Sequence, residues 1–135
     1  MKRIEFEKDS ELKVILKAAF ESSGLQQISI PDKVTRIENR TFFECAHMKC
    51  IEFTEKSELK SIGEYAFVHN AFGGIVLPPK LQFIEKFAFM GCQQLQILKI
   101  PENNELKYIH EDAFHCSNAM IVFGPPGLES VYKKE

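Results

Sequence analysis

The sequence lacks both a long apolar run and an excess of charge of one sign. No stretch approaches the roughly 18 apolar residues of a membrane-spanning helix, so we expect no membrane insertion. The 17 basic and 19 acidic residues give a formal net charge of −2. This balance argues against nucleic acid or an anionic membrane surface as the partner. Its length of 135 residues and apolar fraction of 44% are ordinary for one globular domain.

Short motifs that carry known catalytic chemistry are also missing. We find no nucleophile elbow, Walker loop, dinucleotide fingerprint or HExxH zinc motif. Cys45 and His47, and His115 and Cys116, are pairs of metal-ligating residue types. They lie in separate turns and do not supply a quartet of ligands. We therefore expect a protein with no enzymatic activity, no metal site and no cofactor.

Cysteine is scarce, and its spacing is not that of a zinc site. The four cysteines are Cys45, Cys50, Cys92 and Cys116. Cys45 and Cys92 each stand eight residues after an isoleucine, Ile37 and Ile84, which begins a repeated motif. Equivalent positions in a repeat indicate a packing role, and a chain this rich in apolar residues does not need disulfides. We expect free, largely buried thiols.

A motif that recurs five times dominates the sequence. In each copy an isoleucine precedes a phenylalanine by five residues, and an alanine or threonine stands directly before the ring. The five phenylalanine anchors are Phe20, Phe42, Phe67, Phe89 and Phe114, which are 22, 25, 22 and 25 residues apart. Self-similarity at a regular spacing predicts a repeat solenoid, in which stacked units share one apolar core.

Each unit has a second apolar pattern before its anchor. Full copies begin at Met1, Leu25, Met48, Phe72 and Leu95 and read apolar-x-x-apolar-x-apolar, with a partial copy at Met120. The final alternation has a period of two, which predicts a half-buried strand, and we expect one strand per unit with parallel stacking. A Leu-x-x-Ile step and the short stretch ending in Ala-Phe follow, and this stretch predicts a helical or 3₁₀ turn on the convex side.

The sequence thus predicts a single domain, residues 1–135, with an α/β-type repeat solenoid fold of about six parallel strand rungs. The expected units are about 1–24, 25–47, 48–71, 72–94 and 95–119, followed by a C-terminal cap at 120–135. Long units carry a polar insert, as at Ser57, and short units turn through proline, as at Pro31 and Pro78.

Several stretches resemble the BspA-like class of leucine-rich repeat. The clearest is LQFIEKFAFMGC, from Leu81 to Cys92, and Ile28-Ser29-Ile30-Pro31 matches the end of the strand motif. The sequence departs from the pattern where Ser23, Asn70 and Ser117 replace the cysteine. The resemblance implies a curved leucine-rich repeat solenoid that contacts other proteins. Relatives occur in mucosal bacteria and protist parasites, and many are cell-surface adhesins.

The variable positions along the strands suggest where a partner protein binds. The N-terminal rungs are charged and polar, whereas the C-terminal rungs become apolar around a glycine pair. The candidate binding residues are Cys50, Glu52, Gly73, Gly74, Val76, Ile97, Lys99, Ile121 and Val122. Two plainer interpretations stay open: β-branched residues simply suit strands, and the C-terminal segment covers Ile121 and Val122.

A linear motif near the N-terminus supports an alternative function. Arg3, Ile4 and Phe6 belong to a stretch that resembles the RVxF-type docking motif for a type-1 protein phosphatase. The chain is then an intracellular regulator that docks a signalling enzyme, although Ile4 and Phe6 are also expected core residues of a strand. The sequence begins inside a strand pattern, which suggests a fragment or a homo-oligomer formed through an open N-terminal strand edge.

Localisation is open on the sequence evidence. The N-terminus has no apolar stretch typical of a secretory signal, and free thiols suit a reducing compartment. These observations suggest the cytoplasm or nucleus, whereas the family resemblance suggests the cell surface.

Overall fold

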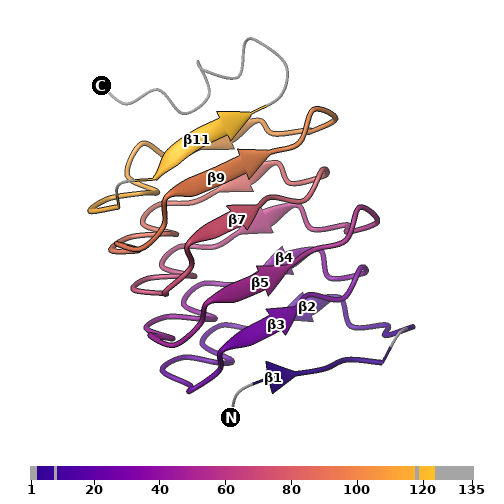
Figure 1. The fold of residues 1–135 in the computed structure, drawn as a ribbon. Helices are drawn as coiled ribbons and strands as arrows, with labels where there is room; N and C mark the ends of the chain where they lie inside the picture. Colours follow the sequence, from indigo (N-terminus) through magenta and orange to yellow (C-terminus); the bar gives the residue numbers. More distant parts are fainter. Residues whose placement is uncertain (1–2, 8, 118, 124–135) are drawn as a thin grey trace.

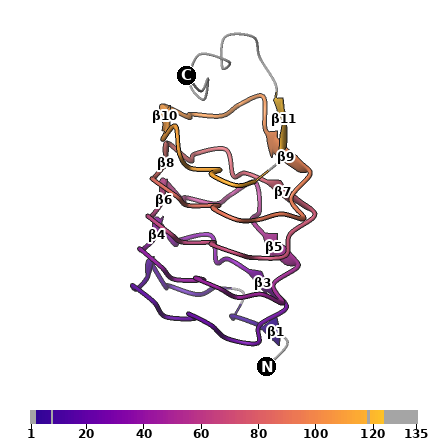
Figure 2. The ribbon, with the colours of Figure 1, turned by 90° about the vertical axis from the view of Figure 1, so that its left-hand side faces the viewer.

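The chain winds into a column of stacked coils with a strand on each of two sides (Figure 1). The computed structural model describes residues 3–7, 9–117 and 119–123. The first face carries β1 (Arg3–Ile4), β3 (Gln27–Ser29), β5 (Cys50–Glu52), β7 (Gly74–Val76), β9 (Ile97–Ile100) and β11 (Met120–Phe123). The second face carries β2 (Val14–Ile15), β4 (Arg36–Ile37), β6 (Ser61–Ile62), β8 (Phe83–Ile84) and β10 (Tyr108–Ile109). Figure 2 shows the two faces on opposite sides of the column.

Every strand pair is parallel, which confirms the predicted stacking of one unit on the next. The first face consists of two three-stranded sheets, β1-β3-β5 and β11-β9-β7, and the second is one sheet in the order β10-β8-β6-β4-β2. The prediction of one strand per unit was wrong, because each Leu-x-x-Ile step ends in a second strand. These second-face strands have only two residues each, too few for an alternation that sequence periodicity can detect.

The expected helical turns are absent from the described residues, so the α/β label is not confirmed. The turns around the anchors instead contain residues with positive φ, for example Tyr65 before Phe67 and His69 after it, both at 59°. Some backbone amides of these turns bond to the next coil, as the Phe67 amide does to the Ala88 carbonyl at 2.7 Å, and others bond three residues back, as the Ala66 amide does to the Gly63 carbonyl at 3.3 Å. The coil-to-coil pairing continues the parallel architecture through the turns, and the bonds three residues back form single turns rather than a continuous helix.

The phenylalanine anchors form one continuous stack inside the column, as predicted. Ring centroids are 5.4 Å apart for Phe20 and Phe42, 5.3 Å for Phe42 and Phe67, 5.2 Å for Phe67 and Phe89, and 5.1 Å for Phe89 and Phe114. Interplanar angles of 4° to 14° make all four pairs stacked. Phe42, Phe67 and Phe89 are fully buried. Such stacking adds to the stabilisation from apolar burial.

A row of polar side chains runs beside this stack and explains why the cysteine of the family motif is replaceable. Each side chain donates a hydrogen bond to the carbonyl of the anchor in the preceding coil. The bonds are Cys45 Sγ to Phe20 (3.0 Å), Asn70 Nδ2 to Phe42 (2.9 Å), Cys92 Sγ to Phe67 (3.0 Å) and Ser117 Oγ to Phe89 (2.7 Å). Each of these carbonyls also accepts a backbone amide three residues on, so the side chain supplies a second donor, and the position needs a small donor rather than a thiol.

All four cysteines are free, and their burial follows their place in the repeat. Cys45 and Cys92 are buried as predicted, Cys50 is half-buried, and Cys116 is exposed. Burial raises the pKa of the Cys92 thiol to about 12. The thiols in the core therefore behave as small hydrophobic groups with a weak donor.

The last described rung has a different register from the one its sequence predicts. The predicted alignment places Ile121 beside Gln96 and Val122 beside Ile97. In the structure Ile121 pairs with Leu98 and Val122 with Lys99, a shift of two residues. The run Met120–Phe123 is apolar throughout, so it lacks the alternation that specifies register.

Candidate protein-binding face

The candidate residues on β5, β7 and β9 alternate with the buried core as the strand pattern requires. Ile51, Ile75 and Leu98 are buried at equivalent positions of the three strands. The residue that follows each of them, Glu52, Val76 or Lys99, is exposed. The structure therefore brings these outward positions together on the first face, in neighbouring coils (Figure 1).

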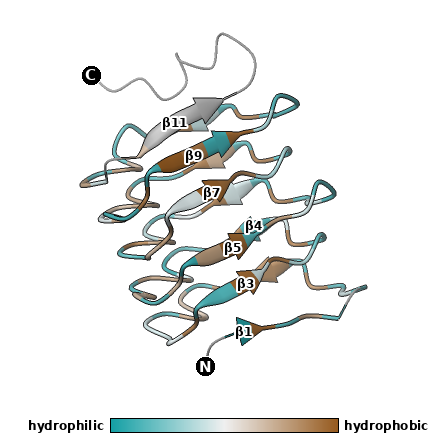
Figure 3. Cartoon of the chain, in the orientation of Figure 1, coloured by the Kyte–Doolittle hydropathy of each residue, from teal (hydrophilic) through white to brown (hydrophobic). Residues whose placement is uncertain are grey.

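Two apolar side chains are conspicuously exposed on this part of the first face. Val76 on β7 is 57% exposed and Ile97 on β9 is 47% exposed. Gly74 is paired with Ile97 across the two strands, and a Cβ added there would lie 3.6 Å from the Ile97 carbonyl oxygen. A Cβ added at Gly73 would meet nothing within 4 Å. The hydropathy colouring shows apolar stretches on β9 of this face (Figure 3).

The first face is interrupted between β5 and β7. No ladder pairing joins these two strands, although β6 and β8 of the same two coils stay paired on the second face. The interruption coincides with Phe72, which occupies the position held by a leucine or methionine in the other full copies. Phe72 is fully buried and packs edge-on against Phe67 at 5.6 Å.

Beside Val76 lies a small open hollow of about 240 Å³ between the loops that leave the first face. Its apolar lining includes Phe53, Leu77, Pro78, Pro79 and Pro101, and its polar lining is Thr54, Glu55 and Asn103. The hollow extends the apolar surface from β7 toward the loops. Its size suits a single side chain of a partner protein better than a small-molecule ligand, since ligand pockets usually exceed about 300 Å³.

Near Cys50, burial and the Glu52 carboxylate both raise the pKa of the thiol, burial having the larger effect. Glu52 in turn accepts a hydrogen bond from the Ser29 hydroxyl on β3 at 3.1 Å. Cys50 thus presents a neutral thiol at neutral pH. For Ile121 and Val122 the structure describes only the backbone pairing, so their place in a binding surface stays a prediction.

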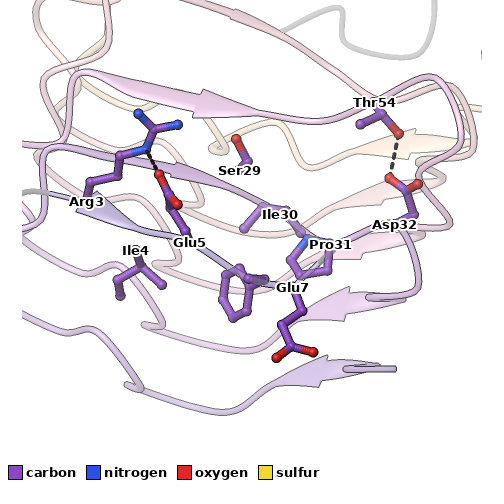
Figure 4. A pocket seen from close by; sticks show the side chains of 10 residues that line it. Arg3, Ile4, Glu5, Glu7, Ser29, Ile30, Pro31, Asp32 and Thr54 are labelled. Atoms are coloured by element: carbon purple, nitrogen blue, oxygen red, sulfur yellow. Dashed lines mark hydrogen bonds and ion pairs between the residues drawn. The ribbon is translucent and has the colours of Figure 1, made fainter. Parts of the chain in front are cut away.

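The residues of the phosphatase-type motif lie at the N-terminal coil. Arg3 is exposed and forms an ion pair with Glu5 at 3.2 Å, whereas Ile4 and Phe6 are half-buried against the core. An open hollow of about 430 Å³ lies among β1 and the loops after β1 and β3. Figure 4 shows Arg3 and Glu5 on one side of the strand and Ile4 on the other. Within the described residues β1 pairs only with β3, so its other edge has no strand partner there.

Sequence reasoning missed a row of aromatic side chains on the outside of the turns. Phe43, Tyr65, Phe87 and His115 follow one another at centroid distances of 6.4, 5.3 and 5.7 Å. Arg40 lies 3.8 Å from the centre of the Phe43 ring, and Lys86 lies 5.0 Å from that of Phe87. The row uses different positions in different repeats, so no single sequence column reveals it. Its rings pack mainly on one another and on these cations.

In the part of the chain that the structure describes, no cluster of three or more His, Cys, Asp or Glu side chains is placed to hold a metal ion. Nor does any helix there have the length and apolarity to cross a membrane. Where a histidine there does meet a carboxylate, it meets one partner rather than a cluster, as His69 meets Glu44 at 3.2 Å.

Solved structures with this architecture come from bacterial leucine-rich repeat proteins. A leucine-rich cell surface protein from Faecalibacterium prausnitzii has 25% identity and a TM-score of 0.77, covering 98% of this chain and 35% of that one. A leucine-rich repeat protein of T. pallidum has 22% identity and a TM-score of 0.73, covering 88% and 57%. One from Bacteroides ovatus has 24% identity and a TM-score of 0.69, covering 83% and 29%.

The chain therefore spans between 29% and 57% of the length of these relatives. No curated protein matches it significantly. The family model of the BspA type leucine-rich repeat region matches residues 13–134 with six copies of the repeat. Leucine-rich repeat families are generally non-enzymatic scaffolds for protein interaction. With its parallel coils, stacked phenylalanines and matching repeats, the chain belongs to the BspA type leucine-rich repeat family.

Proposed function

We propose that this chain is a non-catalytic protein-binding module whose contact surface is the first face around β5, β7 and β9. The observation that supports the proposal is the exposure of Val76 and Ile97, 57% and 47%, next to the glycine pair. Large apolar side chains in a common exposed area mark surfaces that other proteins cover. The hollow lined by Phe53 and Leu77 adds an apolar recess beside Val76.

An adhesin-type role at a cell surface is the form of this function that we favour. It is supported by the likeness to a leucine-rich cell surface protein, at 25% identity over 98% of this chain. A stack of short coils offers a flat array of outward positions that vary without disturbing the core, which suits binding to protein surfaces. The free thiols are compatible with this role because Cys45 and Cys92 are buried in the core.

Docking of a type-1 protein phosphatase through Arg3, Ile4 and Phe6 remains the alternative function. The geometry favours it less, because Ile4 and Phe6 are half-buried against the core. Strand β1 would have to separate from β3 before either side chain could enter a partner's groove. Alanine substitutions at Ile4 and Phe6, assayed by pulldown of the phosphatase, test this alternative.

The binding proposal is tested by replacing Val76 and Ile97 together with lysine. The matched control is Leu16→Lys, which changes a 68% exposed apolar side chain away from the first face. We expect the double variant to lose the proteins that the unchanged chain captures from native cell material under crosslinking, and the control to retain them. Circular dichroism establishes that both variants fold. Equal capture by a folded double variant would contradict the proposal.

A further inference from the structure

We propose that the first face also recognises a second copy of this chain, in a two-fold symmetric dimer centred on β7. This inference rests on the proposed function, since it takes the same face as the contact surface and names a partner for it. It is carried by the arrangement of charge, apolar groups and glycine across β5, β7 and β9.

Two rows of outward residues cross the three strands. One row is Glu52 on β5, Val76 on β7 and Lys99 on β9, and all three side chains are exposed. Val76 and Lys99 are register partners. Negative charge, an apolar group and positive charge thus follow one another, with the apolar group in the middle.

The side chains of the second row differ in size in a way that allows two copies of the face to fit together. Cys50 on β5 is small and half-buried, Gly74 on β7 has no side chain, and Ile97 on β9 is large and 47% exposed. Gly74 and Ile97 are register partners. The surface along this row is therefore low at β5, lowest at the central strand β7 and highest at β9.

A two-fold axis that lies in the interface and runs along β7 pairs unlike features. It places β5 of one copy over β9 of the other, so Glu52 faces the Lys99 of the second copy twice. It brings Val76 against Val76, and the protruding Ile97 over the small Cys50. An isologous contact of this kind is the commonest way in which proteins form dimers.

Charge selects this axis over the alternative. An axis perpendicular to the strands and centred on the row of Glu52 and Lys99 would place Glu52 against Glu52 and Lys99 against Lys99, and like charges in contact oppose association. A further row of outward residues, just before β5, β7 and β9, consists of Lys49, Gly73 and Gln96. The axis along β7 places Lys49 opposite the neutral Gln96 of the second copy. That row therefore adds no repulsion.

The glycines allow the two faces to approach. Facing sheets pack about 10 Å apart, and side chains fill the space between them. With Gly73 and Gly74 at the centre, the side chains of Val76 and Ile97 from both copies occupy that space. The contact is formed by three strands of three or four residues each, so we expect a weak dimer whose fraction rises with concentration.

The test is a charge exchange followed by sedimentation velocity over a concentration series. Glu52→Lys alone and Lys99→Glu alone each place like charges opposite each other, so each should raise the dimer dissociation constant by about tenfold or more. An equimolar mixture of these two variants should dimerise again, because every Lys then faces a Glu. The double variant E52K/K99E should also dimerise.

Three results would overturn the dimer: a monomer at every concentration, a dimer unaffected by either single exchange, or no recovery in the mixture. Association through the outer edge of β1 would give the second result, since it does not involve Glu52 or Lys99. A monomeric chain whose V76K/I97K variant still loses its captured proteins would refute only the dimer. A dimer that follows the charge exchange, with capture unchanged in V76K/I97K, would instead refute the proposed function.

Discussion

Replacing Phe67 with alanine should remove the centre of the aromatic stack and destabilise the whole column. Phe67 is fully buried, with ring neighbours at 5.3 Å (Phe42), 5.2 Å (Phe89) and 5.6 Å (Phe72). A Phe-to-Ala change in a core typically costs about 3–5 kcal/mol, because it loses transfer free energy and leaves a cavity. Each lost aromatic pair accounts for roughly 0.5–1.5 kcal/mol beyond area burial. We therefore expect the upper part of the 3–5 kcal/mol range.

Phe20→Ala is the matched control. Phe20 makes the same repeat contact but is only half-buried and has one stacked neighbour, Phe42 at 5.4 Å. The neighbouring coils also relax more easily around a terminal site than around a central one. We expect its cost to be about half that of Phe67→Ala or less.

The measurement is urea unfolding followed by far-ultraviolet circular dichroism for both variants and the unchanged chain. Repeat proteins can unfold in parts, so the denaturant slope must be compared as well as the midpoint. A central substitution that uncouples the two halves would lower the slope. A loss below about 1 kcal/mol for Phe67→Ala, or equal losses at the two positions, would refute the argument that a continuous stack holds the coils together.

Further outcomes follow from particular contacts. Asn70→Val should cost about 0.5–1.5 kcal/mol in urea unfolding, because the Phe42 carbonyl loses its side-chain donor and keeps only the Cys45 amide, whereas Asn70→Cys should retain most of the stability. Gly63→Ala should destabilise, because its Cβ would lie 2.5 Å from the Asn39 side chain and 2.8 Å from its backbone nitrogen, whereas Gly73→Ala, in open space, should change stability little. Iodoacetamide should modify exposed Cys116 in the folded protein and buried Cys92 only after unfolding; the reverse order, read by mass spectrometry, would contradict the packing. Since the pKa of Cys92 rises from 9.0 to about 12 on folding, only the unfolded thiol ionises between these values. Stability should therefore fall as pH rises through that range, and less steeply in Cys92→Ala.

The repeat could be recognised in the sequence because all five anchors are phenylalanines. A phenylalanine stands five residues after an isoleucine in all five copies, so the same residue type fills the same place in each coil. The alternation at Ile28 and Ile51 likewise predicted the strands of the first face. Where a position is buried in every coil, its apolar character repeats and its role can be inferred.

Features held by backbone geometry were harder to infer. Residues with positive φ include Tyr65 and Phe87, whose residue types give no sign of this conformation. Gly91 also has a positive φ, and glycine is the residue type that favours it. The second-face strands are too short to alternate, and the apolar run at Met120–Phe123 can slide without violating any pattern. In each case the decisive contact is a hydrogen bond to the next coil, which leaves no mark on side-chain periodicity.

The separation of inward from outward side chains explains how a binding surface can change while the fold persists. The stack is held by inward side chains such as Phe67, by donors such as Asn70 and by backbone ladders, none of which depends on the outward side chains of the first face. Val76 and Lys99 can therefore vary at little cost to stability, since surface substitutions away from such contacts usually shift it by less than about 0.5 kcal/mol. In the proposed interface, Val76 supplies the apolar contact, and the charges at Glu52 and Lys99 give that contact a direction.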